Sequence, residues 1–119
     1  MERYRELEHR TMAFAKDVVR LCKTLPRDAA TIELIRQVVR SAGSVGANYR
    51  EANEKLSKKD FLLRLRIARK EAKETTYWLE IIQEAAPAAK EHIHILILES
   101  QELRNILSAI LSKAEGHGR

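Results

Sequence analysis

Apolar residues recur at alternating intervals of three and four positions in four separate segments of this chain. Residues spaced in this way lie on one side of an α-helix and form the seam along which it packs against other helices. The four seams are Leu7, Thr11, Phe14, Val18, Leu21 and Leu25; Ile35, Val38, Ala42, Val45, Tyr49, Ala52 and Leu56; Phe61, Leu65, Ala68, Ala72, Thr75, Leu79, Ile82 and Ala86; and Ile93, Leu96, Ser100, Leu103, Leu107, Ile110 and Ala114. The pattern predicts an all-α fold of four long helices.

Residues that stop or cap helices fall between the seams. Pro26 is followed by Asp28 as a candidate N-cap, Ser57 opens a variant of the capping box with residues 58–60, and Pro87 comes at the start of the last helix. Short connections between long helices make consecutive helices antiparallel neighbours. We therefore expect a single domain, residues 1–119, folded as an antiparallel up-down-up-down four-helix bundle.

The composition agrees with a compact helical protein, since 45% of residues are hydrophobic, 33% are charged, and only four are glycine. The first ten residues contain no apolar signal core, and no segment approaches the roughly 20 apolar residues that span a bilayer. We expect a cytoplasmic protein without membrane association. The single cysteine, Cys22, cannot form an internal disulfide and lies beside a seam, which favours packing over nucleophilic catalysis.

Residues 58–73 account for the whole net charge of +5, because they contain seven basic and two acidic residues while the remainder holds fifteen of each. Lys59, Arg66, Lys70 and Lys73 share one outward ridge that ends at Tyr77. Such a ridge suits contact with a polyanion, and the alternative is a solvated charged face. The same helix begins with lysines and carries Glu80 and Glu84 towards its end, against the preference set by the helix dipole.

The second segment presents a related surface. Arg36, Arg40 and Arg50 lie on its outer ridge and flank Gly43 and Ala47, so arginines border a patch with almost no side chains. Two glycines within a helix, Gly43 and Gly46, cost about 1 kcal/mol each relative to alanine. Three explanations are open at this point: the close approach of a neighbouring helix, within or between subunits, the approach of a nucleic-acid backbone, or a local kink.

Apolar residues outside the seams have two interpretations. They are Leu63, Ile67, Trp78 and Ile81 in the third segment and Ile95, Leu98 and Ile106 in the fourth. They either widen the core-facing stripes of amphipathic helices or form an interface between subunits. The second interpretation assigns Trp78, Ile81, Ile95 and Leu98 to an oligomer interface.

Two Glu-x-x-His pairs resemble the spacing that di-iron four-helix bundles use, namely Glu6 with His9 and Glu91 with His94. All four residues fall at outer positions of the seams' heptad frame, and the interior positions carry no carboxylate. Because the chain also lacks a phosphate-binding glycine loop and a metal-spaced cysteine set, we expect no metal, no cofactor and no enzymatic activity.

The segment SVGANYREA, residues 44–52, and the motifs that follow it resemble a known family. These motifs are Lys59-Asp60-Phe61, Ile67-Ala68, Lys70-Glu71-Ala72, Glu74-Thr75 and Tyr77-Trp78-Leu79-Glu80. Together they are similar to the bacterial four-helix bundle family encoded in intervening sequences of 23S ribosomal RNA genes. The resemblance covers nearly the whole chain and is densest over residues 41–82.

This resemblance implies a four-helix bundle that assembles as a ring-like homopentamer. It also implies kinship with the accessory variability protein of diversity-generating retroelements, a basic pentamer associated with nucleic acid and a reverse transcriptase. The family's signatures match Asn48, Arg50, Glu51, Lys59, Lys70, Glu71, Glu74, Trp78 and Glu80. Glu51 or Glu71 could pair with basic groups on adjacent helices, which would make part of the signature structural.

We therefore expect a non-enzymatic, oligomeric nucleic-acid-binding protein that contacts phosphates, with RNA favoured over DNA. Its predicted contact residues are Lys59, Arg66, Arg69, Lys70, Lys73, Arg36, Arg40 and Arg50. The low aromatic content, 5%, disfavours base stacking as the main mode of binding. The alternative is a structural or adaptor bundle that docks a protein partner such as a reverse transcriptase.

Overall fold

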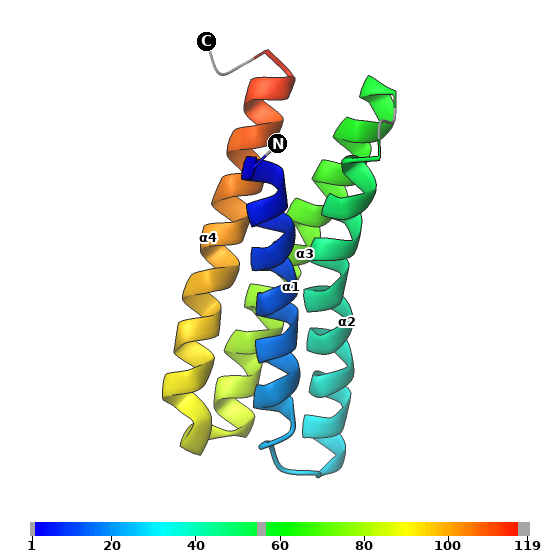
Figure 1. Cartoon of the computed structure of the whole chain (residues 1–119). Coiled ribbons are helices and arrows are strands. Elements are labelled where there is room, and N and C mark those ends of the chain that lie inside the picture. The colour runs from blue at the N-terminus through cyan, green and yellow to red at the C-terminus, as the bar shows by residue number, and fades with distance from the viewer. Residues whose placement is uncertain (1, 55–56, 117–119) are drawn as a thin grey trace.

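The computed structural model describes residues 2–54 and 57–116, with side chains from residue 5 onwards. Four α-helices follow one another: α1 (Glu2–Cys22), α2 (Ala29–Ala52), α3 (Lys58–Ala85) and α4 (Lys90–Ala114), with a short 3₁₀ turn, η1 (Pro87–Ala89), before α4. They run alternately up and down along a rod of 45 × 24 × 22 Å (Figure 1). Each of α1 and α3 packs against both α2 and α4, so the predicted antiparallel four-helix bundle is confirmed.

The predicted helix starts are confirmed in two cases and shifted in the third. The Asp28 carboxylate accepts a hydrogen bond of 2.9 Å from the Thr31 backbone N–H at the start of α2, and Ser57 Oγ accepts one of 3.2 Å from Asp60 N–H at the start of α3. Pro87 opens η1 rather than α4, which begins at Lys90. At the other end of α4, Gly116 adopts a φ of 83°, a left-handed conformation that glycine tolerates best.

The core follows the seams closely. Every seam residue of α1 and its following loop, from Leu7 to Leu25, is buried, as are most seam residues of the other helices. Leu56 lies outside the described residues. The burial pattern shifts by one residue at the end of α4. The seam predicts that Ile110 is buried, but Ile110 is only partly buried and its neighbour Leu111 is buried instead. A strict seven-residue repeat slips gradually around an α-helix of 3.6 residues per turn, which explains the shift.

Small polar side chains join the helices halfway along the bundle. The buried Thr75 hydroxyl donates to Ser41 Oγ on α2 at 2.9 Å, and Thr76 Oγ1 lies 2.6 Å from Ser100 Oγ on α4. Each of these hydroxyls also lies within hydrogen-bond distance of a backbone carbonyl of its own helix, so the buried Ser41, Thr75 and Ser100 have their hydrogen bonds made. The layer lets α3 approach both neighbours with short side chains.

The two glycines of α2 have different surroundings. A Cβ at Gly46 would lie 2.8 Å from Thr11 Oγ1 on α1, so the close approach of a neighbouring helix within the chain explains this residue. A Cβ at Gly43 would meet nothing within 4 Å. α2 runs without interruption from Ala29 to Ala52 through both glycines.

Candidate nucleic-acid interface

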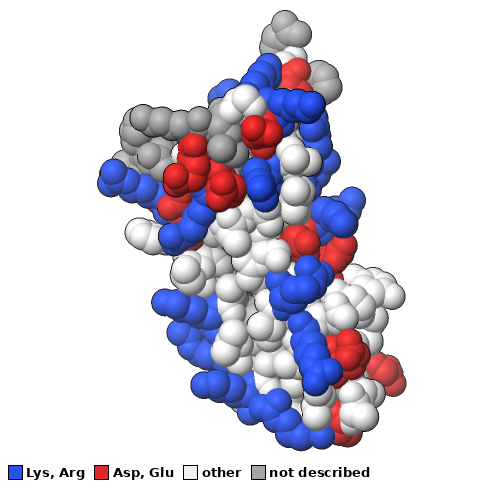
Figure 2. All heavy atoms as spheres, turned by 90° about the vertical axis from the view of Figure 1, so that its right-hand side faces the viewer, with Lys and Arg blue, Asp and Glu red and all other residues white. Residues whose placement is uncertain are grey.

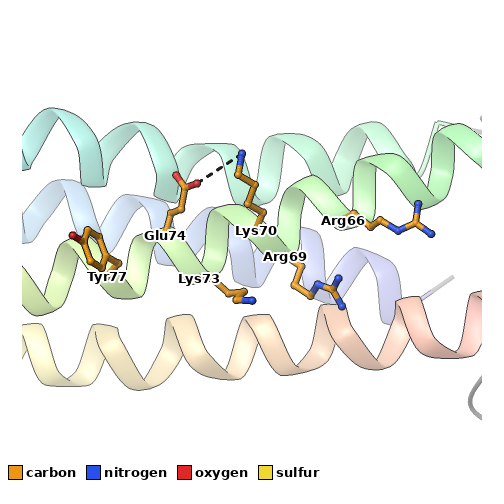
Figure 3. Close-up of a pocket in the computed structure, with 6 residues that line it drawn as sticks. All are labelled: Arg66, Arg69, Lys70, Lys73, Glu74 and Tyr77. Carbon is orange, nitrogen blue, oxygen red and sulfur yellow. Dashed lines mark ion pairs between the residues drawn. The ribbon is translucent and has the colours of Figure 1, made fainter.

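The predicted basic ridge lies on the outer face of α3. Lys59, Arg66, Lys70 and Lys73 are all exposed there, and Tyr77 follows them with 57% of its surface exposed. A shallow hollow of about 310 Å³ is lined by Arg66, Arg69, Lys70, Lys73, Glu74 and Tyr77. In Figure 3, Lys70 and Glu74 point towards α2, whereas Arg69 and Lys73 point towards α4. The hollow therefore combines four cations, one carboxylate and one aromatic ring.

Two of these cations are engaged by carboxylates of the same chain. Arg66 pairs with Glu115 just beyond the end of α4, and Lys70 Nζ lies 3.8 Å from Glu74 Oε2 (Figure 3). The spacing of four residues between Lys70 and Glu74 makes their pairing predictable from sequence. The pairing of Arg66 with a residue 49 positions away depends on how α3 and α4 are aligned, which no local pattern shows.

Arg69 and Lys73 form no ion pair with any side chain in the part of the chain that the structure describes. They lie one helical turn apart on the side of α3 that faces α4 (Figure 3). A phosphate approaching them would not displace an intramolecular carboxylate. Lys73 is exposed and Arg69 is half-buried, and they are the two cations of the hollow without a carboxylate partner among the described residues.

Arg40, predicted as a phosphate contact, pairs with carboxylates of the same chain. Its guanidinium reaches from α2 to two carboxylates of α3, with Nη1 lying 3.4 Å from Glu71 and Nη2 lying 3.2 Å from Glu74. Glu71 is buried, with 9% of its surface exposed, so the expectation of an interior without a carboxylate was wrong. The suggestion that Glu71 pairs with a basic group of an adjacent helix is confirmed. Through these pairs Arg40 helps to hold α2 against α3.

The other two arginines of α2 predicted as contacts, Arg36 and Arg50, lie on a surface that faces solvent. Arg36 and Arg50 are exposed, as are Gly43 and Ala47 between them, and Arg36 Nη1 lies 3.5 Å from Glu33 on its own helix. Figure 2 shows the side of the bundle on which α2 lies, where Lys and Arg side chains border an uncharged band. The bare patch predicted on α2 is thus present and faces solvent.

The residues predicted for an oligomer interface fall on two different faces. On α3, Trp78 packs against the core and Ile81 is half-buried. Trp78 lies on the side of α3 next to α2, because Glu74 and Thr75, within one turn of it, contact α2. Ile95 and Leu98 are 61% and 52% exposed and line a groove of about 410 Å³ between α4 and α1. The four residues therefore do not form one patch.

Charged pairs bridge the groove between α1 and α4. Arg10 donates from Nε and Nη2 to the two carboxylate oxygens of Glu99, at 2.7 and 2.9 Å, and His92 Nε2 lies 3.2 Å from Asp17 Oδ1. Sequence reasoning missed the Arg10–Glu99 pair, because nothing in the spacing of residues 89 positions apart points to it. These bridges hold the two helices together beside the exposed Ile95 and Leu98.

The candidate metal residues Glu6, His9, Glu91 and His94 are all exposed. Among the described residues, no three His, Cys, Asp or Glu side chains gather closely enough to hold a metal ion. Cys22 is buried, and this burial raises the pKa of its thiol to about 11, which disfavours the reactive thiolate. The described helices also include none with the length and apolar character needed to cross a membrane.

The fold and the charge distribution define a four-helix bundle with a basic outer face on its third helix. The sequence matches the family described as 23S rRNA-intervening sequence protein over residues 5–109, and the chain belongs to this family. Its structure is similar to the crystal structure of a protein of unknown function from the S23 ribosomal protein family of Bacteroides thetaiotaomicron. The TM-score is 0.79 at 35% identity, covering 87% of this chain and 96% of the other. A comparison with curated proteins found no match.

Proposed function

We propose that this protein is a non-enzymatic, oligomeric nucleic-acid-binding protein that holds phosphates on the outer face of α3. The observation that carries the proposal is the hollow in which Arg69 and Lys73 stand without intramolecular carboxylate partners among the described residues. A solvated face would need no such concentration of one charge, since like charges four residues apart on a helix repel by about 0.2–0.5 kcal/mol per pair. The family description names 23S rRNA, which makes RNA the first nucleic acid to test.

The predicted contacts differ in how many carboxylates of the same chain they already pair with. Arg69 and Lys73 are available for phosphate, Arg66 and Lys70 must exchange a carboxylate for it, and Arg40 is tied to the buried Glu71. Lys59, exposed near the start of α3, extends the surface, and Arg36 and Arg50 are the candidates on α2. Binding through such contacts neutralises phosphates and releases counterions, so it is steeply salt-dependent and depends little on base sequence.

The decisive experiment is a salt titration of binding to a labelled RNA fragment. The logarithm of the affinity should fall with the logarithm of the salt concentration, with a slope of about 0.7–0.9 per phosphate neutralised. Arg69→Gln with Lys73→Gln should lower that slope by up to about two, and Arg66→Gln with Lys70→Gln by less. The control is Lys16→Gln with Arg20→Gln on α1, which changes the net charge equally on a helix behind α3 (Figure 3).

An unchanged slope in the Arg69/Lys73 variant would mean that the basic face is solvated. Arg36→Gln with Arg50→Gln tests whether α2 joins the surface without disturbing Arg40. Purified wild-type protein also offers a quick check, because bound nucleic acid raises the ratio of absorbance at 260 nm to that at 280 nm and salt should remove it.

The second candidate is an adaptor bundle that docks a protein partner. The exposed Ile95 and Leu98 beside the α1–α4 groove favour it, because apolar side chains gathered at a groove are typical of protein contacts. The same residues serve self-association in the leading proposal, where we infer a ring-like homo-oligomer, a pentamer by family resemblance. A ring requires two different complementary surfaces on each subunit, and the separated pairs Trp78/Ile81 and Ile95/Leu98 are compatible with that requirement.

A further inference from the structure

The ring of Tyr77 stands exposed at one end of the basic hollow. Although 57% of its surface is exposed, it is held by an edge-to-face contact with Trp78, with ring centroids 5.1 Å apart and an interplanar angle of 73°. Trp78 itself packs against the core. The tyrosine thus presents an ordered aromatic surface to solvent, although its exposure means that it buries little area for the fold.

Tyr77 continues the line of cations along the helix. It lies one turn beyond Lys73 and two turns beyond Lys70, and a rise of 1.5 Å per residue places its backbone about 6 Å from that of Lys73 along the helix axis. Figure 3 shows the ring at the end of the row opposite Arg66. A flexible polyanion lying on Arg69 and Lys73 would therefore carry its next groups to the ring of Tyr77.

Glu74 makes the charge on the two sides of the hollow different. Its carboxylate points towards α2, paired with Lys70 and Arg40, while Arg69 and Lys73 point towards α4 (Figure 3). On the α2 side, Glu74 and Glu71 compensate the charges of Lys70 and Arg40, whereas Arg69 and Lys73 on the α4 side are not compensated by any described carboxylate, so a phosphate is attracted more strongly to the α4 side. The backbone of a bound strand would follow the α4 side and leave its base free to turn towards the aromatic ring.

We propose that this hollow is a nucleotide subsite for single-stranded RNA, in which one unpaired base stacks on Tyr77 while adjacent phosphates contact Arg69 and Lys73. The inference rests on the proposed nucleic-acid binding and adds the class of strand that the site selects. Every base has a π-face, so one stack of this kind tolerates any sequence. A duplex keeps its bases stacked inside the helix and cannot supply a free one, so it gains only the phosphate contacts.

The test compares three probes: a 12-nucleotide oligoadenylate, an RNA duplex of the same length, and inorganic polyphosphate. Tyr77→Leu should weaken oligoadenylate binding about 5- to 150-fold, the range expected for losing one stacked base. It should leave duplex and polyphosphate affinities unchanged and leave the salt slope intact, because no phosphate contact is lost. Tyr77→Phe keeps the ring and should bind oligoadenylate as wild type does. Trp78, the single tryptophan, provides a fluorescence signal beside the ring.

The outcomes separate this inference from the proposed function. If Tyr77→Leu binds oligoadenylate as tightly as wild type while Arg69→Gln with Lys73→Gln weakens all three probes, the stacking subsite is overturned and phosphate binding stands. Equal loss of all three probes in Tyr77→Leu overturns the subsite as well. If wild type binds none of the probes at low salt, the proposed function itself fails. Circular dichroism of each variant confirms that the helices are intact.

Discussion

Arg40 on α2 and Glu71 on α3 form an ion pair in which the carboxylate is buried and the guanidinium is half exposed. Arg40 Nη1 lies 3.4 Å from each oxygen of the Glu71 carboxylate, and the Glu71 side chain is 12% exposed against 51% for Arg40. Glu71 Oε1 receives no hydrogen bond from the described residues, so Arg40 supplies the compensating charge. The arginine therefore makes it possible to keep a carboxylate between the two helices.

The first prediction is that Arg40 matters more for stability than Glu71 does. Arg40→Met should lower the free energy of unfolding by about 1–3 kcal/mol, because it leaves a buried carboxylate without a partner. Glu71→Leu should lower the free energy of unfolding by less, since Arg40 would still pair with Glu74 and be hydrated by solvent. Combining the two should recover much of the loss, which urea denaturation of all four proteins would measure. A double variant less stable than Arg40→Met would contradict this account.

The second prediction uses the two glycines of α2 as a matched pair. Gly46→Ala should destabilise the chain by about 1–3 kcal/mol, because the new Cβ would crowd Thr11. Adding Thr11→Ala should relieve part of this loss. Gly43→Ala faces open space and should stabilise the folded chain by up to about 1 kcal/mol through helix propensity. If Gly43→Ala instead weakens assembly, another subunit packs on that patch.

The sequence was sufficient for the fold and for the position of the basic ridge, because both depend on periodicity along single helices. Seam residues such as Val18 and Leu65 are buried and ridge residues such as Lys70 are exposed, as the repeat predicts. Contacts between helices were not predictable in detail, since they depend on how the helices are aligned. The pairing of Arg66 with Glu115 and the buried state of Glu71 belong to that class.

The third prediction concerns assembly through α4. Ile95→Asp with Leu98→Asp should reduce the mass in solution while preserving helicity, because both side chains are more than half exposed within one chain. Light scattering measures the mass, and Met12→Asp with Val19→Asp, at sites 42% and 40% exposed on α1, is the control. A wild-type mass near 13.7 kDa at every concentration would contradict self-association altogether.

The fourth prediction concerns the thiol of Cys22. Burial raises its pKa to about 11, so in the folded protein it should react slowly with iodoacetamide at pH 8 and quickly after unfolding. The unfolded thiol ionises near its usual pKa of about 8.5. This contribution to stability is complete below that pH and is lost as the pH rises towards 11. Comparison with Cys22→Ala isolates it, and fast labelling of the folded protein at pH 8 would argue against burial in solution.

The last prediction tests why α3 carries acidic residues near its end. Glu80 and Glu84 are exposed there and form no ion pair with the described part of the chain. If they meet the basic first half of α3 in a neighbouring subunit, Glu80→Lys with Glu84→Lys should weaken the oligomer, most strongly at low salt. The isolated helix should not suffer, because cations near a helix C-terminus are favoured by about 0.3–1 kcal/mol each. Weaker assembly would therefore report a lost contact between subunits rather than unfolding.

Glu6→Lys with Glu54→Lys makes the same change in net charge elsewhere and should leave the mass unchanged. Equal masses for wild type and the Glu80/Glu84 variant across salt concentrations would show that these residues do not join subunits.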